Sequence, residues 1–172
     1  FNVGKLNRSN VEYARHMEVL AEIDGMTGLY NKSKYLSILK NEYDEIPQVS
    51  VIFWDINNLK VINDTNGHEE GDLLIRTVAT NILNLANENK KAFRIGGDEF
   101  IMILKDADEA ETLKTIDLWK KNIDSIKDEY SFEISASIGY AFGHGKDLQE
   151  LIKQADENMY IDKKQYHESV KN

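Results

Sequence analysis

The chain has 172 residues, which at roughly 100–200 residues per domain fits a single domain. Its 30 acidic residues outnumber its 21 Lys and Arg residues, and the formal net charge of −9 argues against broad binding to nucleic acid or to an anionic membrane surface. Cysteine is absent, which excludes disulfides, thiolate metal sites and a cysteine nucleophile and fits a reducing compartment.

The N-terminal part of the chain is predicted to be helical. Apolar residues at helical spacing indicate a helix over residues 8–23, with Ser9 as its N-cap. A second helix is expected over residues 33–43, before Pro47 interrupts the chain. The chain does not begin with Met and has no signal-peptide pattern, so we expect a piece of a longer protein and interpret residues 1–23 as a linker helix from an upstream region.

The middle of the chain alternates between strands and helices. Val49–Ile56 is a run of apolar, β-branched and aromatic residues that predicts a buried strand. The elements expected after it are helices at 58–65 and 72–86 and strands at 91–95 and 99–104. Gly96 and Gly97 lie between these two strands and predict a tight hairpin turn, because glycine adopts positive φ without strain.

Three further elements complete the pattern. They are a helix at 107–128, a strand at 132–142 and a helix at 147–164 that Asp147 caps. Helices that alternate with strands and one hairpin predict an α/β or α+β sheet with helices packed on it. No apolar run approaches the roughly 18 residues of a membrane span, and we expect residues 24–172 to form the main domain.

Acidic residues stand at two predicted strand ends. Asp55 closes the first strand, and Asp98 and Glu99 follow the glycine turn. If the first strand and the hairpin are neighbours, these carboxylates converge, repel one another and favour a hard divalent cation such as Mg²⁺. The alternative is structural, because Gly-Gly-Asp makes a good turn and an Asp at a strand end often caps the next helix.

The segment after Asp55 carries polar residues suited to a nucleotide. A loop that enters a helix offers free backbone N–H groups to phosphate oxygens, and Lys60 adds a positive charge one turn into that helix. Asn63 and Asp72 supply an amide and a carboxylate, which can pair with the edge of a guanine base. The alternative is a polar surface loop in which Asn58 is an ordinary N-cap.

The string Arg-Ile-Gly-Gly-Asp-Glu-Phe at residues 94–100 resembles the signature of the GGDEF family, the diguanylate cyclases. The resemblance extends over five blocks in the family's order. Besides the signature, these blocks are the opening Asp24–Lys32, the stretch Asp55–Asp72, the late strand Ser135–Gly139 and the closing helix Ala155–Lys163. Together they span most of the chain, so the pattern is far more specific than one pentapeptide.

The resemblance implies a palm-like, ferredoxin-like mixed sheet flanked by helices, as in nucleotidyl cyclases. It also implies an enzyme: a nucleotidyltransferase, the output domain of a bacterial signalling protein, that condenses two GTP into cyclic di-GMP plus two pyrophosphates by a two-metal mechanism. The expected cofactor is Mg²⁺ or Mn²⁺, with two ions per active site. GTP as the substrate implies a cytoplasmic location for this domain, whether or not its parent protein is anchored to a membrane.

The roles of family residues carry over to the matching positions. Asp55, Asp98 and Glu99 match the metal-binding carboxylates, and the backbone carbonyl of Ile56 matches a further ligand. Glu99 also matches the residue that helps to deprotonate the attacking 3′-hydroxyl. The residues matched to substrate binding are the guanine-reading pair Asn63 and Asp72 and the group around the phosphates, Asn58, Leu59, Lys60, Gly96, Gly97 and Lys163.

The chain departs from the family pattern at several positions. Asn57 stands where the family usually has Asp, and since that position is not a primary metal ligand we expect tuning rather than loss of activity. The closing Lys-x-x-Gly-Arg reads Lys163-Lys164-Gln165-Tyr166-His167 here. His167 thus replaces a phosphate-binding Arg and is mostly neutral near neutral pH, so either triphosphate binding weakens or Lys164 substitutes.

Two alternatives to an active diguanylate cyclase stay open. A silent regulatory module would bind GTP or a partner protein; the intact Asp55, Asp98 and Glu99 argue against it, and His167 argues mildly for it. A cyclase that makes a mixed cyclic dinucleotide is the other alternative. Asp72 favours guanine, because its carboxylate can accept hydrogen bonds from the guanine N1–H and amino group.

One chain carries one GTP half-site, so two copies must face each other across a twofold axis. We expect a homodimer for catalysis, a mainly monomeric isolated domain, and an upstream sensor joined through the linker helix. Many family members also bind the product at an inhibitory Arg-x-x-Asp site. The matching positions are Asn87 and Lys90, which lack the guanidinium fork and the acceptor, so we expect no tight product binding there.

Overall fold

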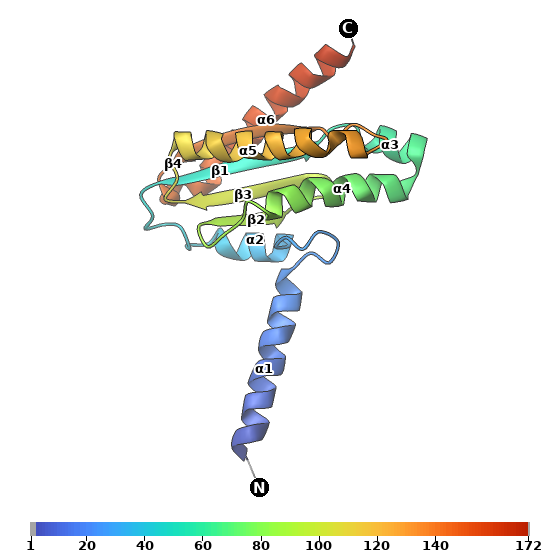
Figure 1. Ribbon diagram of the computed structural model, residues 1–172. Coiled ribbons are helices and arrows are strands. Elements are labelled where there is room, and N and C mark those ends of the chain that lie inside the picture. The colour runs from blue at the N-terminus through green and yellow to red at the C-terminus, as the bar shows by residue number, and fades with distance from the viewer. Residues whose placement is uncertain (1–2, 172) are drawn as a thin grey trace.

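A four-stranded sheet with helices on both faces forms the centre of the structure, a computed structural model that describes residues 3–171 (Figure 1). The strands are β1 (Val49–Ile56), β2 (Lys90–Arg94), β3 (Glu99–Lys105) and β4 (Ala136–Gly143), in the order β2-β3-β1-β4. All of these strands pair antiparallel, and the parallel part of the expected mixed sheet is limited to one isolated bridge between Tyr30 and Phe93. The predicted ferredoxin-like sheet flanked by helices is confirmed.

The helices alternate with the strands along the chain. They are α1 (Val3–Glu22), α2 (Lys32–Ile38), α3 (Leu59–Asn66), α4 (His68–Leu83), α5 (Glu109–Ile126) and α6 (Leu148–Val170), with 3₁₀ turns at Lys127–Glu129 and Gly145–Asp147. Helices α4 and α5 lie on one face of the sheet, and α2 and α6 lie on the other (Figure 1). Among the residues that the structure describes, no helix is both long and apolar enough to span a lipid bilayer.

Alternate residues of the central strands contribute to two separate cores, because successive side chains of a strand point to opposite faces. Trp54 and Phe100 pack on the face covered by α4 and α5. Phe53 and Ile101 pack on the face covered by α2 and α6. Since Asp55 shares the strand parity of Phe53, its carboxylate belongs to the face of the sheet that α6 covers.

Both edges of the sheet are covered by other parts of the chain. Along β4, the backbone N–H of Ile138 donates to Oδ2 of Asp162 at 2.9 Å. The carbonyl of Tyr140 accepts from Nδ2 of Asn158 at 3.0 Å, so two side chains of α6 occupy this edge. Along β2, the backbone of Tyr30 donates one hydrogen bond to the strand and accepts another from it.

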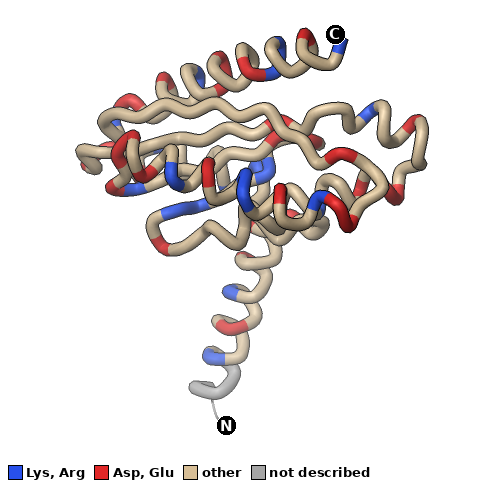
Figure 2. The backbone as a smooth tube through the Cα atoms, turned by 45° about the horizontal axis from the view of Figure 1, so that its top comes forward, with Lys and Arg blue, Asp and Glu red and all other residues tan. Residues whose placement is uncertain are grey.

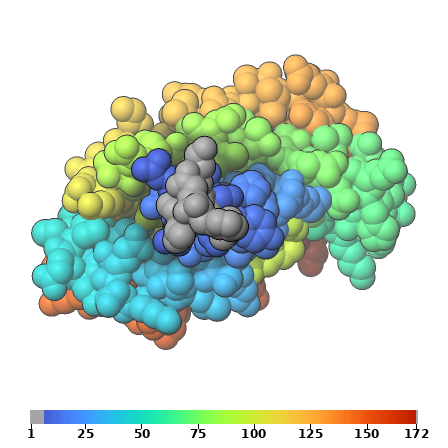
Figure 3. Space-filling model, turned by 90° about the horizontal axis from the view of Figure 1, so that it is seen from below, coloured from blue at the N-terminus to red at the C-terminus, as the bar shows by residue number. Residues whose placement is uncertain are grey.

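Helix α1 projects away from the domain instead of packing on it (Figure 1). Figure 3 looks at the domain from the side on which α1 leaves it, and the helix lies over only a small part of that face. Side chains at residues 7–21 are all exposed, among them Tyr13, Met17 and Leu20. Basic and acidic residues alternate along α1 (Figure 2), so this helix contributes no apolar face to the domain core.

The two N-terminal helices differ from their predicted bounds. Helix α1 begins at Val3, so Ser9 lies inside the helix and is not its N-cap. The prediction depends on apolar residues from Val11 onward, so it places the start of this helix too late. Helix α2 ends at Ile38, and residues 39–45 mostly form turns even though Tyr43 is buried among them.

Strand prediction succeeded for β1, whose bounds match at both ends, and failed at the start of β4. The predicted strand at 132–142 includes four residues that are not in the sheet. Phe132 and Ile134 are buried at alternate positions, as strand residues would be. The carbonyl of Ser135, however, accepts a hydrogen bond from the backbone of Asn57 at 2.9 Å, so this segment closes the end of β1 before β4 begins.

The last helix is longer than predicted and starts without its predicted cap. Asp147 occupies the N-cap position of α6, but its side chain makes no capping hydrogen bond. The helix continues past Lys164 to Val170, because no glycine or proline follows that could stop it. Helix α4, predicted over 72–86, spans His68–Leu83.

Candidate active site

Asp55 and Glu99 lie directly opposite each other on β1 and β3. Both side chains belong to the face of the sheet that α6 covers, because residues in register point to the same side. The backbone N–H of Ile56 donates to the carbonyl of Asp98 at 2.9 Å. The structure thus brings Asp55, Asp98 and Glu99 to one end of the sheet.

The electrostatics of this acidic end oppose full ionisation. Burial raises the pKa of the Asp55 carboxyl, the Lys163 ammonium opposes that rise, and the Asp98 charge adds to it. Burial also raises the pKa of Glu99, with further contributions from the negative charges of Asp55, Asp98 and Asp156. The site therefore holds negative charge that is only partly compensated by this chain.

The donor chemistry fits a hard divalent ion. Across residues 3–171, no three Asp, Glu, His or Cys side chains are grouped closely enough to hold a metal ion among themselves. Asp55 and Glu99 nevertheless offer carboxylate oxygens on one face, and Mg²⁺ is often held by one or two carboxylates together with substrate phosphates. The residues present suit an ion that the protein and a phosphorylated substrate share.

Arg94 fixes the turn that carries Asp98. Its Nε donates to the carbonyl of Gly96 at 3.2 Å, and its Nη2 donates to the carbonyl of Gly97 at 2.9 Å. Nη1 of Arg94 forms an ion pair with Oδ2 of Asp24 at 3.2 Å, directly after α1. One guanidinium therefore joins the end of the linker helix to the turn of the candidate site.

The glycine turn differs from its predicted geometry. Gly28 and Gly67 are the glycines with positive φ in the described chain, so Gly96 and Gly97 do not need the left-handed region. At Gly96 the small size of glycine matters instead, because a Cβ atom would lie 3.0 Å from Oε2 of Glu99. The open turn lets the Glu99 carboxylate pack against the backbone.

Asn57 follows the site and is held away from it. Its Nδ2 donates to Oγ of Ser135 at 2.9 Å, and its Oδ1 accepts from Oγ of Ser137 at 2.8 Å. The side chain is buried, and its amide is satisfied on both sides. Asn57 thus joins β1 to the chain around the start of β4.

The predicted phosphate-binding segment forms the start of α3. Asn58 is the N-cap residue and has φ 62° and ψ 20°, a left-handed conformation in which its side chain makes no capping hydrogen bond. Leu59 begins the helix, and Lys60 is exposed on its first turn. The first N–H groups of α3 are therefore left without a side-chain cap.

The predicted guanine-reading residues lie on α3 and α4. Asn63 packs against Gly71, where a Cβ atom would come within 1.7 Å of the Asn63 Oδ1. Only glycine at this position leaves room for the Asn63 side chain. Asp72 is exposed on the next residue of α4.

Helix α6 makes two contacts that the sequence analysis missed. Lys163, assigned to the phosphates, donates to Oδ1 of Asp55 at 2.9 Å. The hydroxyl of Tyr166 accepts from Nδ2 of Asn58 at 2.7 Å. His167 is exposed, and its ring centroid lies 5.7 Å from that of Tyr166. A tyrosine at the position where the family pattern has Gly was the signal that could have indicated the second contact.

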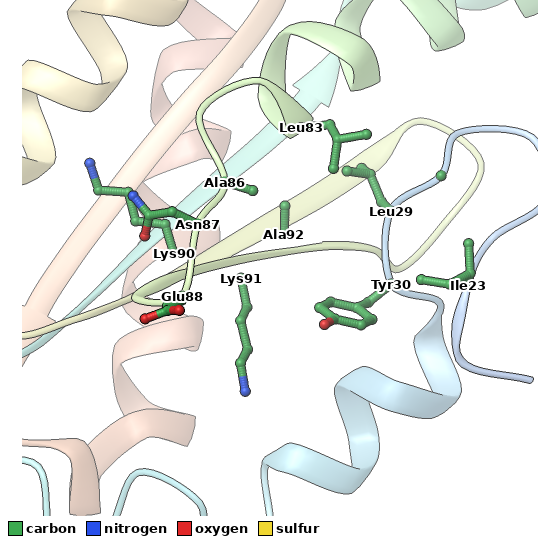
Figure 4. Close-up of a pocket in the computed structure, with 11 residues that line it drawn as sticks. Ile23, Leu29, Tyr30, Leu83, Ala86, Asn87, Glu88, Lys90, Lys91 and Ala92 are labelled. Carbon is green, nitrogen blue, oxygen red and sulfur yellow. The ribbon is translucent and has the colours of Figure 1, made fainter. Parts of the chain in front are cut away.

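A cavity of about 430 Å³ lies beside the turn that carries Asn87 and Lys90 (Figure 4). Nζ of Lys90 donates to Oε1 of Glu111 at 2.7 Å and to Oγ1 of Thr115 at 3.2 Å, so the ammonium is already paired. The Asn87 side chain accepts from the backbone of Asn89 at 2.9 Å. Apolar residues line much of the remaining wall: Ile23, Leu29, Leu83, Ala86 and Ala92.

Residues 21–169 match the family model described as "Diguanylate cyclase, GGDEF domain". The chain is 34% identical over 151 residues to the diguanylate cyclase DosC of Escherichia coli, covering 83% of this chain and 33% of DosC. It is 37% identical over 166 residues to the signaling protein YkoW of Bacillus subtilis, covering 88% of this chain and 20% of YkoW. The chain thus spans a third or less of the length of these two curated relatives.

The fold is similar to that of a solved structure that contains a coiled coil besides its GGDEF domain. The structure of the coiled coil and GGDEF domain of DgcB from Caulobacter crescentus, in complex with c-di-GMP, has a TM-score of 0.79 to this chain. The two sequences are 25% identical, and the match covers 95% of this chain and 91% of that one. The similarity therefore includes most of the region before the domain as well as the sheet.

Proposed function

Because the chain belongs to the GGDEF family of diguanylate cyclases, we propose that it condenses two GTP molecules into cyclic di-GMP and releases two pyrophosphates. The observation that carries this proposal is the juxtaposition of Asp55 and Glu99 across β1 and β3, beside the uncapped start of α3. Carboxylates beside free helix N–H groups suit a metal-bound triphosphate. GTP as the substrate would place the domain in the cytoplasm.

Asp55, Asp98, Glu99 and the backbone carbonyl of Ile56 are the residues that would hold two Mg²⁺ or Mn²⁺ ions. When bound, such ions neutralise the triphosphate and lower the pKa of the attacking hydroxyl. The raised pKa values of Asp55 and Glu99 support this assignment, because a divalent cation would relieve the repulsion that contributes to them.

The substrate would lie across the start of α3 and the α3–α4 pair. The backbone N–H groups of Asn58 and Leu59 and the side chains of Lys60 and Lys163 would bind phosphate oxygens. The Gly96–Gly97 turn would let the backbone approach the nucleotide closely. The residues proposed to read the guanine edge are Asn63 and Asp72.

Catalysis requires proton transfer and orientation by the chain's own groups. Glu99 would accept the proton of the 3′-hydroxyl from its place opposite Asp55 on the sheet. Lys163 would release Asp55 and turn toward the triphosphate. The turn fixed by Arg94 would hold Asp98 in place while the 3′-oxygen attacks the α-phosphorus in line.

Two copies of the domain must meet, because each provides one half-site for a product with two 3′–5′ links. Helix α1 supports a parallel pairing: Tyr13, Met17 and Leu20 repeat at the alternating spacing of a coiled coil and are exposed in the single chain. Asn10 continues this seam with a polar residue of the kind that fixes register. The seam is short, so we expect a mainly monomeric isolated domain, with an upstream sensor controlling the pairing in the longer protein.

The test is incubation of the domain with GTP and Mg²⁺ or Mn²⁺, followed by identification of the product. Cyclic di-GMP should form, and activity per molecule should rise with protein concentration as sedimentation shows more dimer. A mixed cyclic dinucleotide as product would instead identify a cyclase of altered specificity. GTP binding without turnover would identify a silent regulatory module. Constant activity per molecule in a chain shown to be monomeric would contradict the dimer.

A further inference from the structure

The hydroxyl of Tyr166 connects three separate parts of the chain. It accepts a hydrogen bond from Nδ2 of Asn58 at 2.7 Å and donates one to Oε2 of Glu133 at 2.9 Å. Asn58 stands between β1 and α3, Glu133 precedes β4, and Tyr166 lies near the end of α6. Burial and the Glu133 carboxylate raise the pKa of Tyr166, so the hydroxyl keeps the proton that it donates.

The hydrogen bond to Tyr166 changes what Asn58 does for its own helix. An Asn at the N-cap ordinarily turns its side-chain oxygen onto an N–H group of the first turn. Here Asn58 has the left-handed φ of 62°, and its side chain bonds to Tyr166 and does not cap α3. The helix still begins normally, since the N–H of Ile62 donates to the carbonyl of Asn58 at 3.0 Å.

Tyr166 reaches Asn58 only because α6 continues as a helix through its position. The closing pattern of the family has Gly there and Arg at the next position, where this chain has Tyr166 and His167. Lys163 lies three residues earlier and contacts Asp55, so Lys163 and Tyr166 share one face of α6. From that face, one side chain contacts the acidic end of β1 and the other contacts the start of α3.

We propose that Tyr166 is a positioning residue for the triphosphate. By holding Asn58 in the left-handed conformation with its side chain turned away, Tyr166 keeps the first N–H groups of α3 free for phosphate oxygens. This inference rests on the proposed function, since it concerns the same nucleotide site. Tyr166 would thus contribute indirectly to phosphate binding. The next residue, His167, stands at the position of the family's phosphate-binding arginine.

Tyr166→Phe removes the hydroxyl and little else. We expect the affinity for a non-hydrolysable GTP analogue with Mg²⁺, measured by calorimetry, to fall by roughly two- to tenfold, the range for loss of the neutral hydrogen bond that holds Asn58. The hydrogen bond to Glu133 is lost as well, and thermal unfolding of the variant measures its effect on the fold. KM for GTP should rise by a similar factor while kcat changes little, because the reacting groups are untouched. Tyr160→Phe is the matched control, since Tyr160 is exposed on the same helix and its ring is approached by Lys164.

A double-mutant cycle with Asn58→Gly tests whether Tyr166 acts by positioning Asn58 or only by stabilising the packing of α6. Glycine adopts positive φ without strain and has no side chain for Tyr166 to hold. The effect of Tyr166→Phe on GTP affinity should therefore disappear in the Asn58→Gly background. Thermal unfolding of each variant shows whether the fold is retained.

Three outcomes overturn the inference. Unchanged GTP affinity in Tyr166→Phe would exclude a positioning role while leaving the proposed function intact. An equal loss of affinity in the presence and absence of the Asn58 side chain would show that Tyr166 acts elsewhere. No GTP binding by the unsubstituted chain would overturn the proposed function, and the inference with it.

Discussion

Nζ of Lys163 lies 2.9 Å from Oδ1 of Asp55, so an ammonium group from α6 neutralises the most buried carboxylate of the candidate site. Both side chains are largely shielded from solvent, which strengthens their interaction relative to a surface ion pair. A divalent ion at Asp55 would compete with this ammonium. We expect Lys163 to exchange its partner for a phosphate oxygen when the metal and GTP bind together.

Asp55→Asn should abolish metal-dependent turnover with little loss of fold. In the absence of metal, the free energy of unfolding should not fall, because burial opposes the charge that the substitution removes. Added Mg²⁺ with a GTP analogue should raise the Tm of the unsubstituted chain more than that of the variant. Near-normal product formation by Asp55→Asn would contradict the metal assignment.

The stability of the metal-free domain should depend on pH through Asp55 and Glu99. Both folded-state pKa values are raised, so the folded state binds these protons more tightly, and stability should increase as pH falls from neutral toward about 4, the ordinary carboxyl value. The double variant Asp55→Asn, Glu99→Gln loses this contribution. The Tm of the double variant should exceed that of the unsubstituted chain most at neutral pH, and this difference should shrink as pH falls. A Tm difference that does not change with pH would show that these two carboxyl groups do not couple stability to pH.

Gly71→Ala should weaken GTP binding while leaving the fold intact. In an ordinary helix interior this change stabilises by about 1 kcal/mol. Here the added methyl would occupy the position of the Asn63 amide, so Asn63 must move away from its packed conformation. Calorimetry with a GTP analogue measures the loss, and Gly25→Ala, with no atom near the added methyl, is the control. Equal affinities in the two variants would mean that Asn63 does not read the base.

Arg94→Lys should destabilise the domain by about 1–3 kcal/mol, because an ammonium cannot reproduce the planar fork that reaches Asp24 and both glycine carbonyls. Turnover should fall as well, since the turn that carries Asp98 loses its support. Urea denaturation measures the stability. Lys121→Ala is the control. It removes an exposed ion pair with Asp117 and should change the free energy of unfolding by less than about 1 kcal/mol.

Cyclic di-GMP should not bind tightly at the positions of the family's inhibitory site. Lys90 is already paired with Glu111, and Asn87 lacks a charged fork. Calorimetric titration combined with Lys90→Ala tests this expectation. Tight binding that the substitution weakens would overturn it, whereas binding confined to the region of Asp55 and Asp98 would be product occupancy of the proposed active site.

The sequence predicted most of the sheet because burial on both faces leaves a clear pattern. Val49–Ile56 is apolar except for Ser50 and Asp55 and ends before two consecutive Asn residues, so both of its bounds were recognisable. The N-terminal helix was predicted too short because its start was placed at the cap candidate Ser9, whereas the helix begins at Val3. The early start of the last strand arose from Phe132 and Ile134, whose alternate burial imitates a strand.

The candidate site was predictable where single positions match a motif and not where distant side chains meet. The convergence of Asp55 with Asp98 and its neighbour Glu99 followed from neighbouring strands. The contacts from Lys163 to Asp55 and from Tyr166 to Asn58 each join residues 108 positions apart, and the second also depends on the continuation of α6 past its predicted end. Helix length past the motif cannot be inferred from periodicity, since the last turns of α6 have no buried residue.

The closed edges of the sheet limit how two copies of this chain can meet. With Asp162 and Asn158 on β4 and Tyr30 along β2, strand addition by another chain would first have to break existing hydrogen bonds. Copies can then associate through side chains without exchanging backbone. Such encounters would be readily reversible, as the signalling role proposed for this domain requires, and a transient pair would not grow into a β-linked aggregate.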